Sequence, residues 1–201
     1  MEILAKLFGS GSRVKLLRLF LLNTDSAFDV QEIAKRAKVS PATVRSETAM
    51  FERIGLVRRR VIFRDMARGG KKRVQGSVLN DKFPYFTELY RLLVNIPPLG
   101  SSEVVRRLSR VGRIKLLVLS GVFIQNPDSR VDMLIVGDQL KSGALENVMR
   151  ALEADLGKEL RYTAFNTEQF RYRLGIYDKL VRDILDYPHE TVVDRLGIAV
   201  R

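Results

Sequence analysis

Apolar residues recur at helical spacing in three segments of the first 55 residues. RVKLLRLFLL (13–22) and QEIAKRAKV (31–39) each place their apolar side chains on one face. SPATVRSETAMFERIG (40–55) does the same, with Ser40 suited to cap its start and Gly55 its end. The pattern predicts three helices in succession.

The pattern then changes from helical spacing to alternation. VRRRVIFRD (57–65) and KKRVQGSVL (71–79) flank a loop that contains Gly69 and Gly70. Two short alternating runs around a Gly-Gly loop predict a β-hairpin, and the apolar spacing of FPYFTELYRLLV (83–94) predicts a further helix.

A segment rich in proline, glycine and serine, NIPPLGSS (95–102), interrupts the periodic sequence and predicts a boundary between domains 1–97 and 98–201. Beyond it, helical and strand-like segments alternate. The predicted helices are 101–110, 143–157, one from Asn166, and 176–186; the predicted strands are 114–121, 130–137 and 160–166. The fold class is therefore α+β in two domains, the second an α/β unit with a mixed sheet.

Charge separates the two halves. The chain carries +12, of which residues 1–97 contribute +10 (19 basic and 9 acidic residues) and residues 98–201 contribute +2 (16 and 14). A concentrated positive charge favours a polyanionic partner for the first half. With no run near the ~18 apolar residues of a membrane helix and no targeting segment, we expect a cytoplasmic protein without a membrane partner.

Composition limits the chemistry. The chain has no cysteine and one histidine, His189. Disulfides, thiolate nucleophiles and cysteine-based zinc sites are excluded, and a histidine-based metal site or triad is disfavoured. We predict no cofactor.

The segment 31–57 reads as a helix, a short turn and a second helix. Ile33 and Ala34 are expected inside, Val39 in the turn, and Val44, Phe51 and Ile54 beneath the second helix. Its outward face would carry small or hydrogen-bonding side chains, after Ser40: Ala42, Thr43, Arg45, Ser46 and Ala49. Over residues 10–80 the chain resembles a prokaryotic winged helix-turn-helix domain, with Lys38 where such turns usually have glycine. The resemblance implies a recognition helix in the major groove of double-stranded DNA, with Arg45 donating to guanine.

Basic residues crowd the predicted hairpin: Arg58, Arg59, Arg60, Arg64, Arg68, Lys71, Lys72 and Arg73. The resemblance implies that this wing contacts phosphates or the minor groove. Winged helices that bind proteins instead usually lack a basic wing, and RNA binding would require an aromatic platform. Phe63, which alternates with Val61, is expected in the core.

The stretch PDSRVDMLIVGD (127–138) contains three aspartates around a strand. With the preceding Ser120 and Gly121, residues 103–186 resemble a minimal nucleotidyltransferase-like domain. Active members hold two metal ions with carboxylates two residues apart and a third on the next strand. Here those positions are Arg130, Asp132 and Thr163. We therefore predict no metal and no catalytic residue, and expect Arg130 to pair with Asp132, or else to receive an anion in a ligand pocket with Ser120, Gly121 and Asp132.

These features favour a sequence-specific transcriptional regulator whose second domain senses a ligand, such as a nucleotide or other small molecule, or serves assembly. The alternatives are a nucleotidyltransferase that uses the winged helix for targeting, and a scaffold without a ligand. Apolar residues flanking the first domain would either pair two copies as a homodimer or pack on the second domain: Leu4, Leu7, Phe8, Phe86, Leu89, Tyr90 and Leu93.

Overall fold

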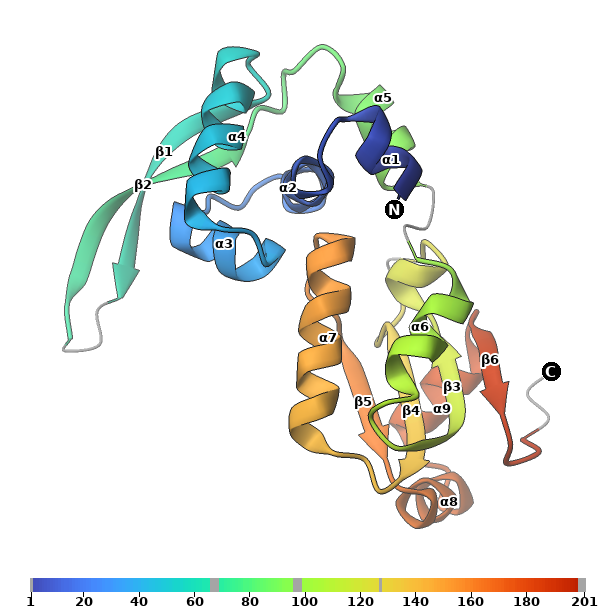
Figure 1. Cartoon of the computed structure of the whole chain (residues 1–201). Coiled ribbons are helices and arrows are strands. Elements are labelled where there is room, and N and C mark those ends of the chain that lie inside the picture. Colours follow the sequence, from blue (N-terminus) through green and yellow to red (C-terminus); the bar gives the residue numbers. More distant parts are fainter. Residues whose placement is uncertain (1, 66–68, 96–98, 127, 199–201) are drawn as a thin grey trace. The chain divides into compact units, whose positions relative to one another are not determined.

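The structure is a computed structural model that describes residues 2–65, 69–95, 99–126 and 128–198. Over these ranges the chain is mixed α+β, with nine α-helices, a two-stranded sheet and a four-stranded sheet (Figure 1). It divides into two compact units, 1–98 with 153–158, and 99–152 with 159–201. No helix in the described ranges is both long and apolar enough to cross a membrane.

The first unit contains five helices and the hairpin. They are α1 (Glu2–Leu7), α2 (Gly11–Leu21), α3 (Val30–Ala37), α4 (Pro41–Arg53), β1 (Val57–Asp65), β2 (Lys71–Leu79) and α5 (Phe86–Leu93). Its core centres on Phe20 of α2, whose ring lies 6.4 Å from Phe28 and 6.4 Å from Phe51. The strands pair antiparallel and extend away from the helices of this unit (Figure 1).

Local capping explains where the middle helices begin. Asp29 accepts hydrogen bonds from the backbone nitrogens of Gln31 and Glu32 at the start of α3. Ser40 accepts one from Thr43, and Pro41 occupies the first turn of α4, as predicted. Between them, Lys38 has φ 52°, in the left-handed region. That conformation explains why glycine is common at such turns, because a side chain is strained there.

The apolar residues expected to pair two copies or to pack on another domain instead pack mostly within this unit. Leu93 is fully buried, and the others that contact the same core are Leu4, Phe8, Phe86, Leu89 and Tyr90. Leu7 remains exposed. Helices α1 and α5 therefore contribute to this unit's own core, although most of these side chains remain only partly buried.

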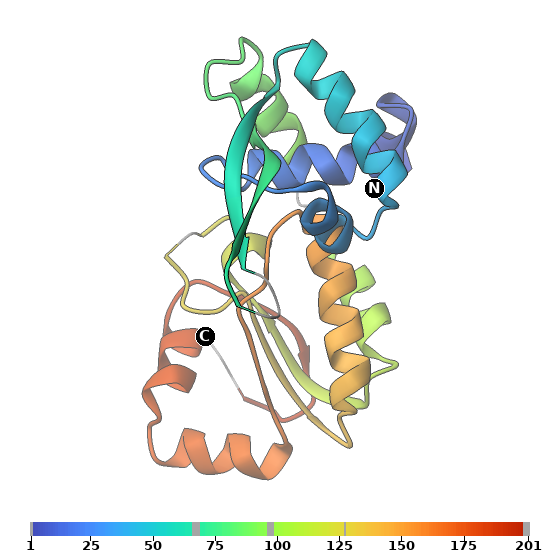
Figure 2. The ribbon, with the colours of Figure 1, turned by 90° about the vertical axis from the view of Figure 1, so that its left-hand side faces the viewer.

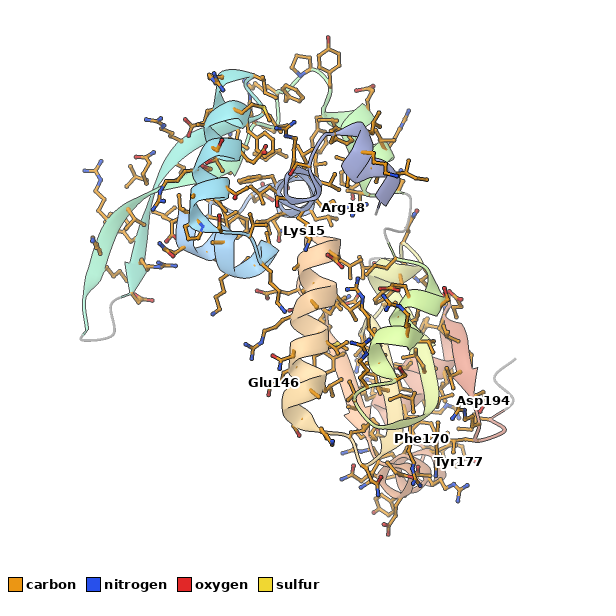
Figure 3. All side chains as sticks on the ribbon, in the orientation of Figure 1. Lys15, Arg18, Glu146, Phe170, Tyr177 and Asp194 are labelled. Carbon is orange, nitrogen blue, oxygen red and sulfur yellow. The ribbon has the colours of Figure 1, made fainter. Side chains whose placement is uncertain are left out.

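Arg18, labelled in Figure 3, is a charged residue inside this unit. It is 1% exposed, and its Nε donates to the carbonyl oxygen of Leu93 at 2.9 Å. Burial lowers its pKa because the guanidinium loses its water. The hydrogen bond joins α2 to the end of α5.

The second unit contains the four-stranded sheet in the order β5-β4-β3-β6. Its elements are α6 (Ser101–Leu108), β3 (Arg113–Leu119), the 3-10 turn η1 (Gly121–Phe123), β4 (Met133–Asp138), α7 (Ser142–Leu156) up to residue 152, β5 (Tyr162–Phe165), α8 (Thr167–Gly175), α9 (Lys179–Asp186) and β6 (Glu190–Asp194). The last residues of α7, 153–156, belong to the first unit. Only β4 and β5 run parallel, so the sheet is mixed.

Helices cover both faces of this sheet, α6 and α7 on one side and α8 and α9 on the other (Figure 2). Leu116 and Val118 of β3 pack toward Phe170 of α8 and Val181 of α9. Asn166 and Gln169 form the reciprocal capping box predicted for the start of α8. Strand β6 was not predicted from the sequence.

Candidate nucleic-acid interface

One face of α4 is exposed and carries small side chains together with Arg45 and Arg53. Ala42, Arg45, Ser46 and Ala49 are exposed, whereas Val44 and Phe51 on the opposite face are buried. Small flanking residues leave room for a close approach to a flat or grooved partner. Ile54, expected beneath the helix, is 53% exposed and does not anchor it, because the helix ends at Arg53.

The two hydroxyls at the start of α4 bond to each other. Ser40 Oγ lies 2.8 Å from Thr43 Oγ1 and also caps the Thr43 nitrogen. Ser40 is exposed and Thr43 is half-buried. Each oxygen has further hydrogen-bonding capacity, so both can meet a partner while they cap the helix.

A half-buried ion pair joins α4 to α2. Glu47 accepts from Arg13 through both carboxylate oxygens, at 2.7 and 3.2 Å, and Arg13 also donates to the carbonyl oxygen of Phe8 at 2.9 Å. The hydrogen bond with Glu47 raises the pKa of Arg13. A bidentate pair of this kind sets the orientation of the helix as well as its position. The sequence did not reveal this role for Glu47.

The hairpin carries two classes of cation. Arg58 pairs with Asp81, Arg59 with Glu52, and Arg64 with Asp29. The other described cations predicted for the wing are exposed and have no ion-pair partner in the described ranges: Arg60, Lys71, Lys72 and Arg73. Arg68 lies outside the described residues.

One paired arginine also links the hairpin to the helices. Asp29 caps α3 with Oδ1 and holds Arg64 of β1 at 3.2 Å with Oδ2. Asp29 is buried, so this contact is screened less than the exposed pairs. It positions the hairpin relative to the start of α3.

Two apolar residues of β1 are exposed, one of which, Phe63, was predicted to lie in the core. Phe63 is 67% exposed and Val61 40% exposed. Phe63 lies directly across from Arg73, and Val61 across from Gln75, so all four side chains share one face of the hairpin. That face presents an aromatic ring beside an unpaired arginine, because no helix of this unit covers it.

In the second unit, the residues predicted to form a ligand pocket do not all line one cavity. Ser120 and Arg130 line a cavity of about 440 Å³ together with Lys179 and Asp183, but Asp132 does not line it. Arg130 pairs with Asp183 of α9 at 2.9 Å, not with Asp132 as expected. The expectation assumed a regular strand, whereas β4 begins only at Met133.

Asp132 is a buried structural carboxylate. Its Oδ1 accepts from the Val122 nitrogen at 3.0 Å, and its Oδ2 accepts from Arg161 through the backbone nitrogen at 2.9 Å and Nε at 3.4 Å. Gly121 lies against it with φ 54°. Thr163 lies on β5 beside Leu134. Within the described part of the chain, no group of three acidic, histidine or cysteine residues could hold a metal ion.

Comparisons with family models, with curated proteins and with solved structures found no match to this chain.

Proposed function

We propose that the protein is a sequence-specific DNA-binding transcriptional regulator of the cytoplasm. The proposal treats the first unit as a winged helix-turn-helix domain with α3 and α4 as its helix pair and β1–β2 as its wing. The second unit is treated as a nucleotidyltransferase-like domain that has become a ligand-sensing or assembly module. A homodimer would match a two-fold operator.

One observation carries the proposal: an exposed helix face with small side chains and two arginines, Arg45 and Arg53, belongs to the same unit as a hairpin with four unpaired cations. The helix face fits the major groove, where an arginine can donate two hydrogen bonds to guanine. The hairpin cations supply contacts to phosphates, which provide affinity without sequence information.

Selection of bound fragments from random duplex DNA tests this function directly. A regulator of this kind enriches one motif, and a two-fold arrangement of half-sites in that motif would support a homodimer. Recovery of unselected fragments only, or of none at low ionic strength, would contradict sequence-specific binding.

Substitution of Lys71 and Lys72 by alanine is expected to weaken binding to every duplex by a similar factor. Each lysine that contacts a phosphate releases a counterion from the DNA. Loss of one such lysine should therefore make the negative slope of log K against log salt shallower by about 0.9. The measurement is affinity for the selected site and for an unrelated duplex at several salt concentrations. Arg91→Ala, an exposed arginine of α5, is the matched control and should leave the slope unchanged.

Phe63→Ala is expected to reduce duplex affinity by about 1 kcal/mol with little change in stability. An exposed ring on the wing can pack against a sugar or a base step in the minor groove, and its exposure means that folding gains little from it. Parallel measurement of affinity and thermal unfolding separates the two effects. A loss of stability with unchanged affinity would assign Phe63 to packing.

The nucleotidyltransferase alternative is tested by incubation with a labelled nucleoside triphosphate and magnesium. The hydrogen bonds of Asp132 argue against this alternative, because both carboxylate oxygens already accept hydrogen bonds from N–H groups. No transfer is expected. Transfer to protein or nucleic acid would establish the enzyme instead.

A further inference from the structure

The second unit contains another cavity, apart from the one beside Arg130. It has a volume of about 490 Å³ and lies where β3 begins and β6 ends. Four cations line it: Arg113, Lys115, Arg171 and Arg195. A volume of this size accommodates a metabolite-sized molecule.

Irregular strand pairing places Lys115 in this cavity. The register between β3 and β4 shifts between Ile114 and Leu116, so Lys115 lies at a bulge. Bulges redirect side chains and are often found beside binding sites. The carbonyl oxygen of Lys115 accepts from the Arg195 nitrogen at 2.7 Å, which brings the segment after β6 to the same place.

Lys115 is already neutralised, whereas the arginines are not. Its Nζ lies 2.7 Å from Asp138, which also accepts from the Thr167 nitrogen and hydroxyl. These interactions, led by Lys115, lower the pKa of Asp138 to about 2. In the described ranges, Arg113, Arg171 and Arg195 have no ion-pair partner, although the half of the chain from residue 98 has a net charge of only +2.

Besides Ser109 and Gly112, the rest of the cavity wall is aliphatic and comes from three elements and the segment that follows β6. The residues are Val105 and Leu108 of α6, Ile114 and Leu117 of β3, Val193 of β6, and Leu196. Asp194, labelled in Figure 3, ends β6 and accepts from the nitrogens of Leu196 and Gly197 with Oδ1. That turn holds Leu196 and the adjacent Arg195 at the cavity.

We propose that this cavity binds a small organic anion, with a phosphate or carboxylate held by the three arginines and an apolar body against the aliphatic wall. Planar guanidinium groups match such anions with paired hydrogen bonds. The like charges of the arginines repel one another when the cavity is empty, so an anion relieves this repulsion as it binds. The site is separate from the Arg130 cavity and does not depend on DNA binding.

The test is calorimetric titration of the full chain at low ionic strength with four probes: inorganic phosphate, pyrophosphate, phenyl phosphate and benzoate. Phenyl phosphate is expected to bind about tenfold tighter than inorganic phosphate, because only its ring reaches the aliphatic wall. Arg113→Gln and Arg195→Gln should each weaken phenyl phosphate binding about tenfold. Arg110→Gln, an exposed arginine that does not line the cavity, should leave it unchanged.

Three results would overturn the proposal. The first is that no probe binds. The second is that binding is lost with Arg130→Gln but retained with Arg113→Gln and Arg195→Gln, which would assign the anion to the other cavity. The third is that the cavity variants weaken duplex binding but no small anion binds, which would make these arginines part of a nucleic-acid surface.

Discussion

Replacing Arg45 by alanine is expected to weaken binding to the preferred duplex by about 1–3 kcal/mol, or roughly 5- to 150-fold, and to relax specificity at one base pair. Arg45 is exposed on a face of α4 that also carries Ala42, Ser46, Ala49 and, two turns further along the helix, Arg53. Arg53 is about 12 Å further along the helix, too far to replace the hydrogen bonds of Arg45 to the same base edge. The expected loss is therefore confined to duplexes that carry the preferred base.

The measurement compares affinities for the selected site, for the three base-pair variants at each position of it, and for an unrelated duplex. Arg45→Ala should lower the affinity for the selected site and reduce the preference for one base pair at a single position. It should change the affinity for the unrelated duplex little. Arg45→Lys is a useful second variant, because it keeps the charge but loses the paired donors. An equal loss of affinity for all duplexes would instead indicate that Arg45 contacts a phosphate. Unchanged affinity for every duplex would contradict the placement of α4 in the major groove.

Local signals explain the parts of the fold that the sequence predicted well. Ser40 before Pro41, and Asn166 three residues before Gln169, specify helix starts through hydrogen bonds between near neighbours. Alternation over 57–65 and 71–79 likewise specifies a hairpin. Such interactions depend on residues a few positions apart, so they can be predicted from a single sequence.

The exposure of a strand face, by contrast, depends on residues far apart in the sequence. Alternation indicates that Val61 and Phe63 share one face of the hairpin, but not whether a helix covers that face. The prediction assumed coverage, and the structure leaves both residues exposed. The same limit applies to β6, because a short segment at a sheet edge gains its strand conformation from pairing with β3.

Long-range ion pairs were also beyond sequence reasoning. Arg130 has an acid two positions away in Asp132, yet it pairs with Asp183 of α9. Asp132 instead accepts from backbone nitrogens, which the sequence cannot show because every residue except proline has one. Of the residues predicted to form a ligand pocket, Ser120 and Arg130 line the cavity beside α9, whereas Asp132 does not.

The bonding of Asp132 predicts the largest stability effect in the second unit. A Cβ on Gly121 would overlap Oδ1 of Asp132 and lie 2.9 Å from its Cγ, and the φ of 54° strains any side chain there. Because Asp132 is held by three N–H donors, it cannot move aside cheaply. Gly121→Ala is therefore expected to lower the free energy of unfolding by about 3–5 kcal/mol. Gly143→Ala, in the first turn of α7 with open space around it, should change it by less than about 1 kcal/mol.

A double-mutant cycle separates this overlap from simple backbone strain. Asp132→Ala alone should cost about 2–4 kcal/mol, because it leaves the nitrogens of Val122 and Arg161 without their acceptor. If the overlap with Asp132 dominates, the double variant should be more stable than the sum of the single losses predicts, by at least about 1 kcal/mol. Urea denaturation followed by circular dichroism gives these free energies. Additive losses would show that Gly121 is required by its backbone conformation alone, and a small loss for Asp132→Ala would contradict its role as a structural carboxylate.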